Sequence, residues 1–277
     1  MNDGTAQIRN DARARTHTGF FTALGGAAIE FVGEAGAAGI LFWRGLKALR
    51  KLPRSMPLLF EQMRRIGIES LPLVIITSIF TGAVTAVQAA YQLREYIPDA
   101  YISSAIYKSV VIELGPVLTA LVVGGRVSAS IAAELGTMRV TEQVDAMEAM
   151  AIDPVRYLAM PRILGALIML PVLTVFADAL AIGGGFVVSN ASLGITPSTF
   201  VGGMKMFFFQ GDVYGGLIKA FVFGGIIALM GCLAGLRAQG GAVGVGQAAT
   251  RAVVASCVLI LISDYVLAIL LFNILFG

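Results

Sequence analysis

The chain has 277 residues, of which 57% are hydrophobic and only 13% charged, and its mean hydropathy is +0.83. A soluble protein carries about 25% charged residues, so this composition excludes a soluble domain and indicates that lipid is the main solvent. The net charge is only +3. One histidine, His17, and two cysteines, Cys232 and Cys257, are too few for a metal centre or a disulfide framework.

The N-terminal region has two parts that precede the first long apolar run. Residues 1–35 form a polar, basic tail without the apolar core of a signal peptide. Residues 37–66 contain short apolar runs that basic residues interrupt, and Trp43 stands among them. This pattern is typical of an amphipathic helix that lies in the headgroup layer. A spanning helix is the alternative that the basic residues disfavour. The tail is therefore predicted to precede a membrane domain over residues 36–277.

Five later stretches are long enough to cross a membrane, because a span needs roughly 20 mainly apolar residues. They are expected at about 70–92, 110–136, 163–188, 213–236 and 252–276. The sequence thus predicts an all-α integral membrane protein with five transmembrane helices after an N-terminal interfacial helix. Small residues in the second span, and Gly231 with Gly235 in the fourth, are expected to let helices pack closely. Gly183–Gly185 is expected to loosen the third.

The distribution of basic residues predicts the orientation of the spans. Fifteen Lys and Arg residues fall in segments that lie inside if the N-terminus is cytoplasmic, and four fall outside or at the outer end of a span. Cytoplasmic segments of membrane proteins carry such an excess. We therefore expect a cytoplasmic N-terminus and an outside C-terminus, and we expect segment 139–151, between the second and third spans, to face the cytoplasm.

The segment between the second and third spans carries an acidic stripe, because Glu142, Asp145 and Glu148 follow one another at three-residue spacing. A helix here would place Val144 and Met147 along a neighbouring apolar side. Such a helix is either a solvated loop or a docking helix that inserts its apolar edge into a cytoplasmic partner. We favour docking, because cytoplasmic loops of membrane proteins are usually basic.

The chain has no phosphate-binding loop of the type G-x-x-x-x-G-K-[ST], since none of its five lysines follows a glycine. We therefore expect a transport protein that binds no nucleotide by this route. Such a protein must either couple to an ion gradient or use a partner that hydrolyses ATP.

Two long motifs carry a resemblance to a known family. Residues 113–162, ELGPVLTALVVGGRVSASIAAELGTMRVTEQVDAMEAMAIDPVRYLAMPR, resemble the signature of the MlaE/YrbE family, and residues 244–272, GVGQAATRAVVASCVLILISDYVLAILLF, resemble its last helix. Members are permease subunits of ABC systems that move phospholipids between the two membranes of Gram-negative bacteria. The resemblance implies an inner-membrane transport subunit that contributes to outer-membrane lipid asymmetry and is not itself an enzyme.

The resemblance also implies partners. These are a second copy of the chain, a cytoplasmic ATPase that binds ATP and Mg²⁺, a periplasmic ring protein with an MCE domain, often a small STAS-domain subunit, and phospholipid as substrate. It implies no cofactor on this chain and no nucleic acid. The ATPase would grip the acidic helix, where residues 142–146 match the family's E-[EQ]-x-D-A motif. The predicted coupling residues are Arg139, Glu142, Gln143, Asp145, Ala146 and Glu148.

Ionisable residues inside the predicted spans are functional candidates by default, and those considered are Glu113, Arg126, Asp178, Lys219 and Asp264. At about 1.5 Å per residue, Glu113 and Lys219 lie within roughly 10 Å of the outer face. They could bind a lipid head group or form an interhelical ion pair. The resemblance favours the head group, because Glu113 matches the family's glutamate before L-G-P and Lys219 matches a lysine that lines the lipid cavity. Some members have Arg where this chain has Ile112, so the contacts are expected to differ.

The sequence also supports predictions for five residues in or near the spans. The resemblance places Tyr96 and Gln92 at the outer end of the first span, where they would contact the glycerol and upper acyl region. Arg126 and Asp264 both lie roughly 15–18 Å from the inner face, so we predict that they form a structural ion pair. Asp178 lies deeper and has no obvious partner in the sequence.

Other functions compete with this interpretation. An ion-coupled secondary transporter of a lipophilic substrate would use Asp178, Asp264 and Glu113 as relays, but such folds usually contain internal repeats and none is evident. An ABC permease for an apolar substrate other than phospholipid is a further alternative. An intramembrane lipid hydrolase is disfavoured, because the only histidine lies in the tail and no nucleophile or metal cluster accompanies it.

Overall fold

The computed structural model describes residue 36, residue 39 and residues 56–275. The chain divides into two units, 1–43 and 44–277, and the helices of residues 56–275 belong to the second. These residues form helices joined by short turns, and they include no strand. The tail expected at 1–35 and most of the interfacial helix expected at 37–66 lie outside the described residues.

The helices follow one another along the chain with few interruptions. They are α2 (Met56–Gly67), α3 (Leu71–Leu93), α4 (Asp99–Ser109), α5 (Gly115–Val140), α6 (Gln143–Ala149), α7 (Met160–Ala191), α8 (Pro197–Met206), α9 (Gln210–Leu236) and α10 (Gly241–Leu275). A 3₁₀ turn, Ile68–Ser70, joins α2 to α3, and two π-helical turns, Val110–Leu114 and Val155–Ala159, precede α5 and α7.

Five helical runs of the described chain are long and apolar enough to span a membrane. They are Met56–Leu93, Asp99–Val140, Val155–Ala191, Gln210–Leu236 and Gly241–Asn273. The predicted all-α membrane protein with five spanning helices is therefore confirmed. The second run begins eleven residues before the predicted 110, because α4 continues into α5 through a π-helical turn. Within the segment 37–66, the described residues that form a continuous helix are those of α2. The position of α2 relative to a membrane stays a prediction.

Local sequence explains several helix ends. Thr196 precedes α8, and its hydroxyl accepts a hydrogen bond from the Thr199 N–H at 3.3 Å, which satisfies a backbone donor that the helix leaves unpaired. Pro197 follows it in the first turn, where a missing N–H does no harm. Between α9 and α10, Gly240 has a φ of 85°, a left-handed conformation that glycine adopts without steric penalty.

Glycines bring α3 and α7 into backbone contact. A side chain on Gly184 of α7 would collide with the carbonyl oxygen of Ile79 on α3, and one on Gly82 of α3 would collide with that of Ala181 on α7. Close approach of this kind is the usual role of small residues between membrane helices. Gly184 and Gly185 therefore lie in close contact with α3, whereas Gly183 faces open space. α7 is one continuous helix, and the expectation that Gly183–Gly185 loosens it stays a prediction.

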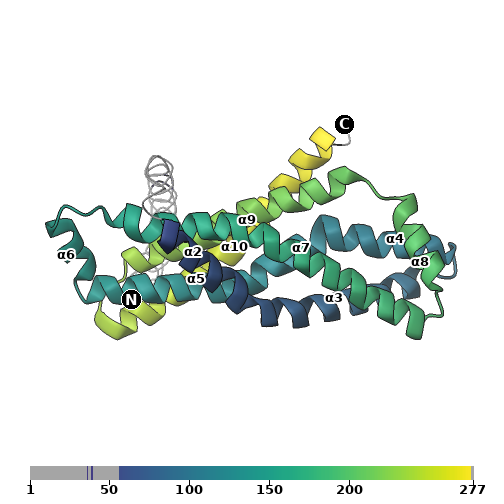
Figure 1. Cartoon of the computed structure of the whole chain (residues 1–277), viewed down its shortest axis with the longest axis horizontal. Coiled ribbons are helices and arrows are strands. Elements are labelled where there is room, and N and C mark those ends of the chain that lie inside the picture. Colours follow the sequence, from purple (N-terminus) through teal and green to yellow (C-terminus); the bar gives the residue numbers. More distant parts are fainter. Residues whose placement is uncertain (1–35, 37–38, 40–55, 276–277) are drawn as a thin grey trace, which may run out of the picture. The chain divides into compact units, whose positions relative to one another are not determined.

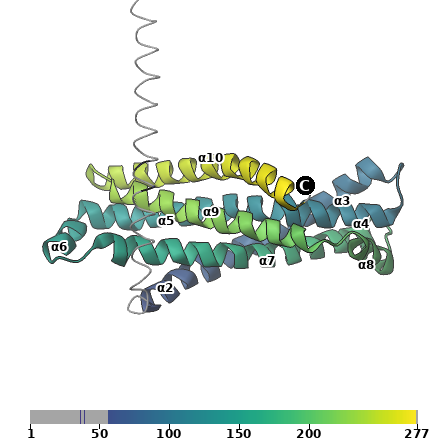
Figure 2. The same cartoon turned by 90° about the horizontal axis from the view of Figure 1, so that it is seen from above.

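A second close contact joins α5 to α9. Gly231 lies against Ile131, and Gly235 lies against Leu135 one helical turn further along. The two helices also pack with α10, which lies beside α5 and α9 in both views (Figures 1 and 2). The predicted packing role of the two glycines is confirmed.

The two ends of the bundle differ in character. Figures 1 and 2 show α6 at one end and α4 with α8 at the other. The α4–α8 end contains a core in which Ile102 and Ile106 pack with Phe200, and the Phe186 ring meets the Phe200 ring edge-on at a centroid distance of 5.3 Å. This core anchors the segment that leads into the π-helical turn before α5.

Large apolar side chains are exposed along the candidate spans. Examples are Phe80 on α3, Val187 on α7 and Tyr265 on α10, which are 66%, 62% and 68% exposed. A soluble monomer rarely exposes a continuous apolar surface of this extent. Such a surface is stable in a bilayer, where it faces acyl chains or other membrane helices.

Candidate functional site

Three charged side chains from different helical segments meet inside the bundle, and we call Glu113, Lys219 and Asp264 the Lys219 cluster. Lys219 Nζ on α9 lies 2.6 Å from Glu113 Oε2 and 2.8 Å from Asp264 Oδ1 on α10. The Lys219 side chain is 3% exposed, whereas the Glu113 side chain is 45% exposed. Glu113 and Lys219 therefore form the interhelical ion pair that was one of the two interpretations of their sequence positions. Asp264 is a third member of this cluster.

The π-helical turn Val110–Leu114 positions Glu113. A π turn contains one residue more than an α turn, and it is often found at functional sites. On the facing helix, a side chain on Gly216 would collide with the carbonyl oxygen of Val111. This contact holds α9 against the turn, and Lys219 follows Gly216 by about one helical turn.

The Lys219 cluster carries one cation and two anions when all three groups are ionised. A buried charge is stable only when it is paired, and the Lys219 ammonium is paired twice. It is therefore not a free cation for a lipid phosphate. The half-exposed Glu113 carboxylate is the member of the cluster that a ligand can reach most easily.

Arg126 and Asp264 do not form the predicted ion pair. Asp264 pairs with Lys219, whereas Arg126 contacts the junction of α2 and α3. The Arg126 Nη2 donates to the Arg65 carbonyl oxygen at 2.6 Å, and its Nη1 lies 3.4 Å from Glu69 Oε2. Two residues at the same depth can still occupy different faces of their helices, and depth alone does not tell which faces meet.

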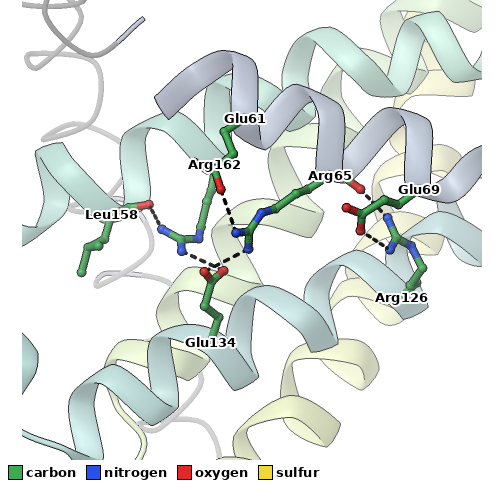
Figure 3. Close-up of polar contacts among 7 residues, drawn as sticks. All are labelled: Glu61, Arg65, Glu69, Arg126, Glu134, Leu158 and Arg162. Carbon is green, nitrogen blue, oxygen red and sulfur yellow. Dashed lines mark hydrogen bonds and ion pairs between the residues drawn. The ribbon is translucent and has the colours of Figure 1, made fainter. Parts of the chain in front are cut away.

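A second cluster surrounds Glu134 of α5, and Figure 3 shows it. Glu134 Oε1 accepts from Arg65 Nη1 of α2 at 3.2 Å, and its Oε2 lies 2.8 Å from Arg162 Nη2 of α7. Arg162 also donates to the Leu158 carbonyl oxygen at 2.6 Å, and Arg65 pairs with Glu61 at 2.7 Å. We call this the Glu134 network. Its charged members are Glu61, Arg65, Glu69, Arg126, Glu134 and Arg162.

The Glu134 network was not predicted, although one of its members carried a usable signal. Glu134 lies inside the span expected at 110–136 and is ionisable at membrane depth, so the argument that selected Glu113 applies to it equally. Arg65 fell in the segment assigned to the interfacial helix. Its contact with α5 depends on α2 folding back beside α5 and α7, which no local pattern indicates.

Two aspartates lie outside both clusters, the half-buried Asp178 and the buried Asp212. Asp178 of α7 has no hydrogen bond or ion pair within residues 56–275, and its Oδ1 faces Gly115, where a side chain would collide with it. Asp212, in the first turn of α9, lies 3.4 Å from Lys108 Nζ on α4. The ion pair between Lys108 and Asp212 was not predicted from the sequence.

Gln92 and Tyr96 lie at the end of α3 and in the turn that follows it. Both are exposed, and the Tyr96 side chain is 81% exposed. Neither has a hydrogen bond to the Lys219 cluster in the described part of the chain. Their contact with lipid stays a prediction.

The acidic segment forms α6, Gln143–Ala149, which is shorter than the expected helix over 139–151. Glu142 and Ala151 adopt left-handed backbone conformations on either side of it, with φ of 60° and 59°. These conformations are uncommon for residues other than glycine. They separate α6 from α5 and from the turn that leads to α7.

The surface of α6 is acidic rather than amphipathic. Arg139, at the end of α5, forms an ion pair with Asp145. Val144 is 3% exposed and packs into the protein, so it is not part of an apolar edge for a partner. Met150 is 64% exposed just beyond the helix. The remaining predicted coupling residues are also exposed, namely Glu142, Gln143, Ala146 and Glu148.

A helical bundle with five candidate spans, a partly buried charge cluster and an exposed acidic helix at one end is consistent with a membrane permease. The chain belongs to the family Permease MlaE, whose model matches residues 59–270. Membership of this family indicates a transport subunit rather than an enzyme.

Individual relatives agree with the family. A probable ABC transporter permease protein of Rickettsia typhi is 39% identical over 246 residues, which cover 89% of this chain and 95% of the relative. A probable ABC transporter permease protein of Synechocystis is 42% identical over 213 residues, or 77% and 81% of the two chains. The intermembrane phospholipid transport system permease protein MlaE of Haemophilus influenzae is 31% identical over 255 residues, or 92% and 98%.

Proposed function

We propose that the chain is the permease subunit of an ABC transporter that moves phospholipids between the inner and outer membranes and so contributes to outer-membrane lipid asymmetry. Family membership supports a permease, and the name of the Haemophilus influenzae relative supports phospholipid as the substrate. A separate ATPase subunit would bind ATP and Mg²⁺ and supply the driving force.

The observation that carries the proposal is the Lys219 cluster. Ionisable residues at membrane depth mark substrate pathways, and this cluster presents one half-exposed carboxylate backed by a buried ion pair. Its charge favours the amine of a zwitterionic head group at Glu113 over a phosphate at Lys219. Gln92 and Tyr96 would contact the glycerol and upper acyl region of the same lipid.

The acidic helix α6 supports an ATPase partner. Its carboxylates are exposed at one end of the bundle, where a soluble subunit with basic residues around a groove could bind them. A motor that holds α6 differently in two nucleotide states would shift the permease between two conformations, as any ligand-driven switch requires.

Charge supports an orientation with α6 and the N-terminus in the cytoplasm and the C-terminus in the periplasm. Basic residues gather towards the α6 end, namely Arg139, Arg156, Arg162, Arg237 and Arg251. Fewer lie towards the α4–α8 end, namely Arg94, Lys108 and Lys205. Cytoplasmic segments carry such an excess. A second copy of the chain, a periplasmic MCE-domain ring and a STAS-domain subunit would complete the assembly.

The head-group assignment is tested by Glu113→Gln, which removes the accessible charge but keeps the shape. Phospholipid that co-purifies with the variant should contain less phosphatidylethanolamine per protein than the unaltered chain, measured by quantitative lipid mass spectrometry. Glu95→Gln, in the exposed turn after α3, is the matched control. Equal lipid content in all three proteins would refute the assignment.

The coupling assignment is tested by Glu142→Lys combined with Glu148→Lys. Neither carboxylate has an ion-pair partner within the described residues, so the double variant should fold and insert, whereas Asp145→Lys would also break the pair with Arg139. We expect the ATPase subunit to be lost from affinity-purified complexes. Glu95→Lys, at the opposite end of the bundle, should retain it. A double variant that retains both the ATPase and nucleotide-driven transport would overturn the coupling role.

An ion-coupled transporter is the alternative function that Asp178 supports, since a half-buried carboxyl without an ion pair among residues 56–275 could relay protons. Lipid transfer in vesicles that contain the full complex separates the two. We expect transfer to require ATP and to persist when an uncoupler removes the proton gradient. The reverse dependence would favour the alternative.

A further inference from the structure

A cavity of about 230 Å³ lies between α2 and α5, and members of the Glu134 network are among the residues that line it. Three arginine side chains line it, Arg64, Arg65 and Arg126, together with the carboxylates of Glu69 and Glu134. The cavity is therefore lined by three guanidinium groups, and the network fixes the positions of two of them, those of Arg65 and Arg126. None of these residues belongs to the Lys219 cluster.

The charges around this cavity do not balance. Within the Glu134 network, three arginines face three glutamates. Arg64 adds one positive charge that no glutamate neutralises, because it is exposed and has no ion-pair partner in residues 56–275. Arg126 Nη1 has only a long contact of 3.4 Å to Glu69, so its guanidinium retains donor capacity towards the cavity.

We propose that this cavity binds the phosphate group of an anionic phospholipid from the surrounding leaflet, held between Arg64 and Arg126. A guanidinium presents a planar fork of N–H donors that matches a phosphate group. Basic pockets between membrane helices are known to bind anionic head groups. An anion here would neutralise the excess charge and give Arg126 Nη1 a stronger acceptor.

The surface beside the cavity suits acyl chains. Phe60 and Ile68 lie one helical turn before and after Arg64, so they share its side of the α2 segment. They are 62% and 60% exposed. A phosphate at Arg64 would therefore be attached to a molecule that meets apolar side chains on both sides, as a phospholipid does and a free inorganic phosphate does not.

This site differs from the one at the Lys219 cluster in place and in charge. Arg126 and Glu113 lie 13 positions apart on one helical run, which corresponds to roughly 20 Å at 1.5 Å per residue. The cavity offers arginines, whereas the Lys219 cluster offers a carboxylate. The inference is therefore independent of the proposed transport site. A lipid bound here would bridge α2 and α5.

The test uses the purified full chain in detergent, titrated with dioleoylphosphatidylglycerol and followed by native mass spectrometry. Arg64→Gln removes the excess charge and breaks no described ion pair. We expect it to weaken binding of this lipid roughly tenfold, as the loss of a charge-assisted hydrogen bond implies. Arg237→Gln, an equal change of charge at an exposed position after α9, should leave the affinity unchanged.

Three results would overturn the proposal. The first is equal affinity of the Arg64→Gln variant and the unaltered chain. The second is an equal loss in the Arg64→Gln and Arg237→Gln variants, which would indicate general attraction to charge. The third is displacement of the lipid by millimolar inorganic phosphate, which would identify free phosphate as the occupant. Dioleoylphosphatidylcholine should bind more weakly than the anionic lipid, and equal binding would also contradict the assignment.

Discussion

Replacing Lys219 by methionine removes the cation from the Lys219 cluster and leaves two carboxylates facing each other. Breaking a buried ion pair by removing one partner destabilises a protein by about 3–5 kcal/mol. Because the Glu113 side chain is 45% exposed and water can solvate it, we expect the lower end, about 3 kcal/mol. For a chain of this size that corresponds to a fall in Tm of roughly 6–12 °C.

The change in Tm caused by a second substitution, Asp264→Asn, should have opposite signs with and without Lys219. In the unaltered chain, Asp264→Asn removes one of the two partners of Lys219 and should lower Tm. In the Lys219→Met background the same change removes a buried, unpaired carboxylate, and it should raise Tm. The coupling between the two positions should be about 1–3 kcal/mol, as is usual for residues of one buried network.

The assay is thermal unfolding of the purified chain in detergent micelles, followed by the loss of helical circular dichroism. Lys205→Met is the matched control, because Lys205 is exposed on α8 and forms no ion pair within the described residues. It should shift Tm by less than about 2 °C. If Asp264→Asn lowers Tm equally in both backgrounds, the two side chains do not interact and the reasoning fails.

Two further predictions concern packing and the Glu134 network. Glu134→Gln should lower stability by about 2–3 kcal/mol in the same unfolding assay, because it leaves the buried Arg162 without its counter-ion. Glu61→Gln removes only a surface pair and should change stability by about 0.5 kcal/mol, so equal effects would contradict the structural role of Glu134. Gly184→Ala should lower stability by about 1–3 kcal/mol, because the methyl group would meet the backbone of α3. Gly183→Ala has open space and should be tolerated, and the reverse order would refute the close contact.

The spanning helices were predictable because their signal is local and strong. A run of apolar residues long enough to cross a bilayer has few alternative explanations. Four of the expected spans lie within helical runs of the structure, and the fifth overlaps the run Gly241–Asn273. Their limits were less predictable. The second run begins at Asp99 because it includes α4. Polar side chains of α4, such as Ser103 and Ser104, are buried against neighbouring elements instead of facing lipid, so the hydropathy of the sequence does not mark α4 as part of a span.

The charged clusters were predictable only in part, because membrane depth is a one-dimensional measure. Depth correctly grouped Glu113 with Lys219, but it also grouped Arg126 with Asp264, which do not meet. Which faces of two helices meet depends on crossing angles and on the π-helical turn before α5. No pattern of residues in the sequence marks those features.

The length of the acidic helix α6 could not be predicted from the sequence. The spacing of the three acids correctly predicted exposed carboxylates, but not the length of α6. The helix is short because Glu142 and Ala151 adopt left-handed conformations. Glutamate and alanine are poor sequence indicators of that conformation, whereas a glycine would have been a clear one.

The π-helical turn Val110–Leu114 has a consequence for how this chain tolerates insertions and deletions. It joins two parts of one long helical run that pack against different helices. α4 packs against α8, and α5 packs against α9 and α10. Each residue of a helix turns the direction of its side chain by about 100°. The turn already contains one residue more than an α turn, so loss of a single codon here would leave Ile102 and Ile106 packed against Phe200. The same loss within the uninterrupted helices on either side would rotate their two parts relative to each other, so this short stretch should tolerate a one-residue deletion better than they do.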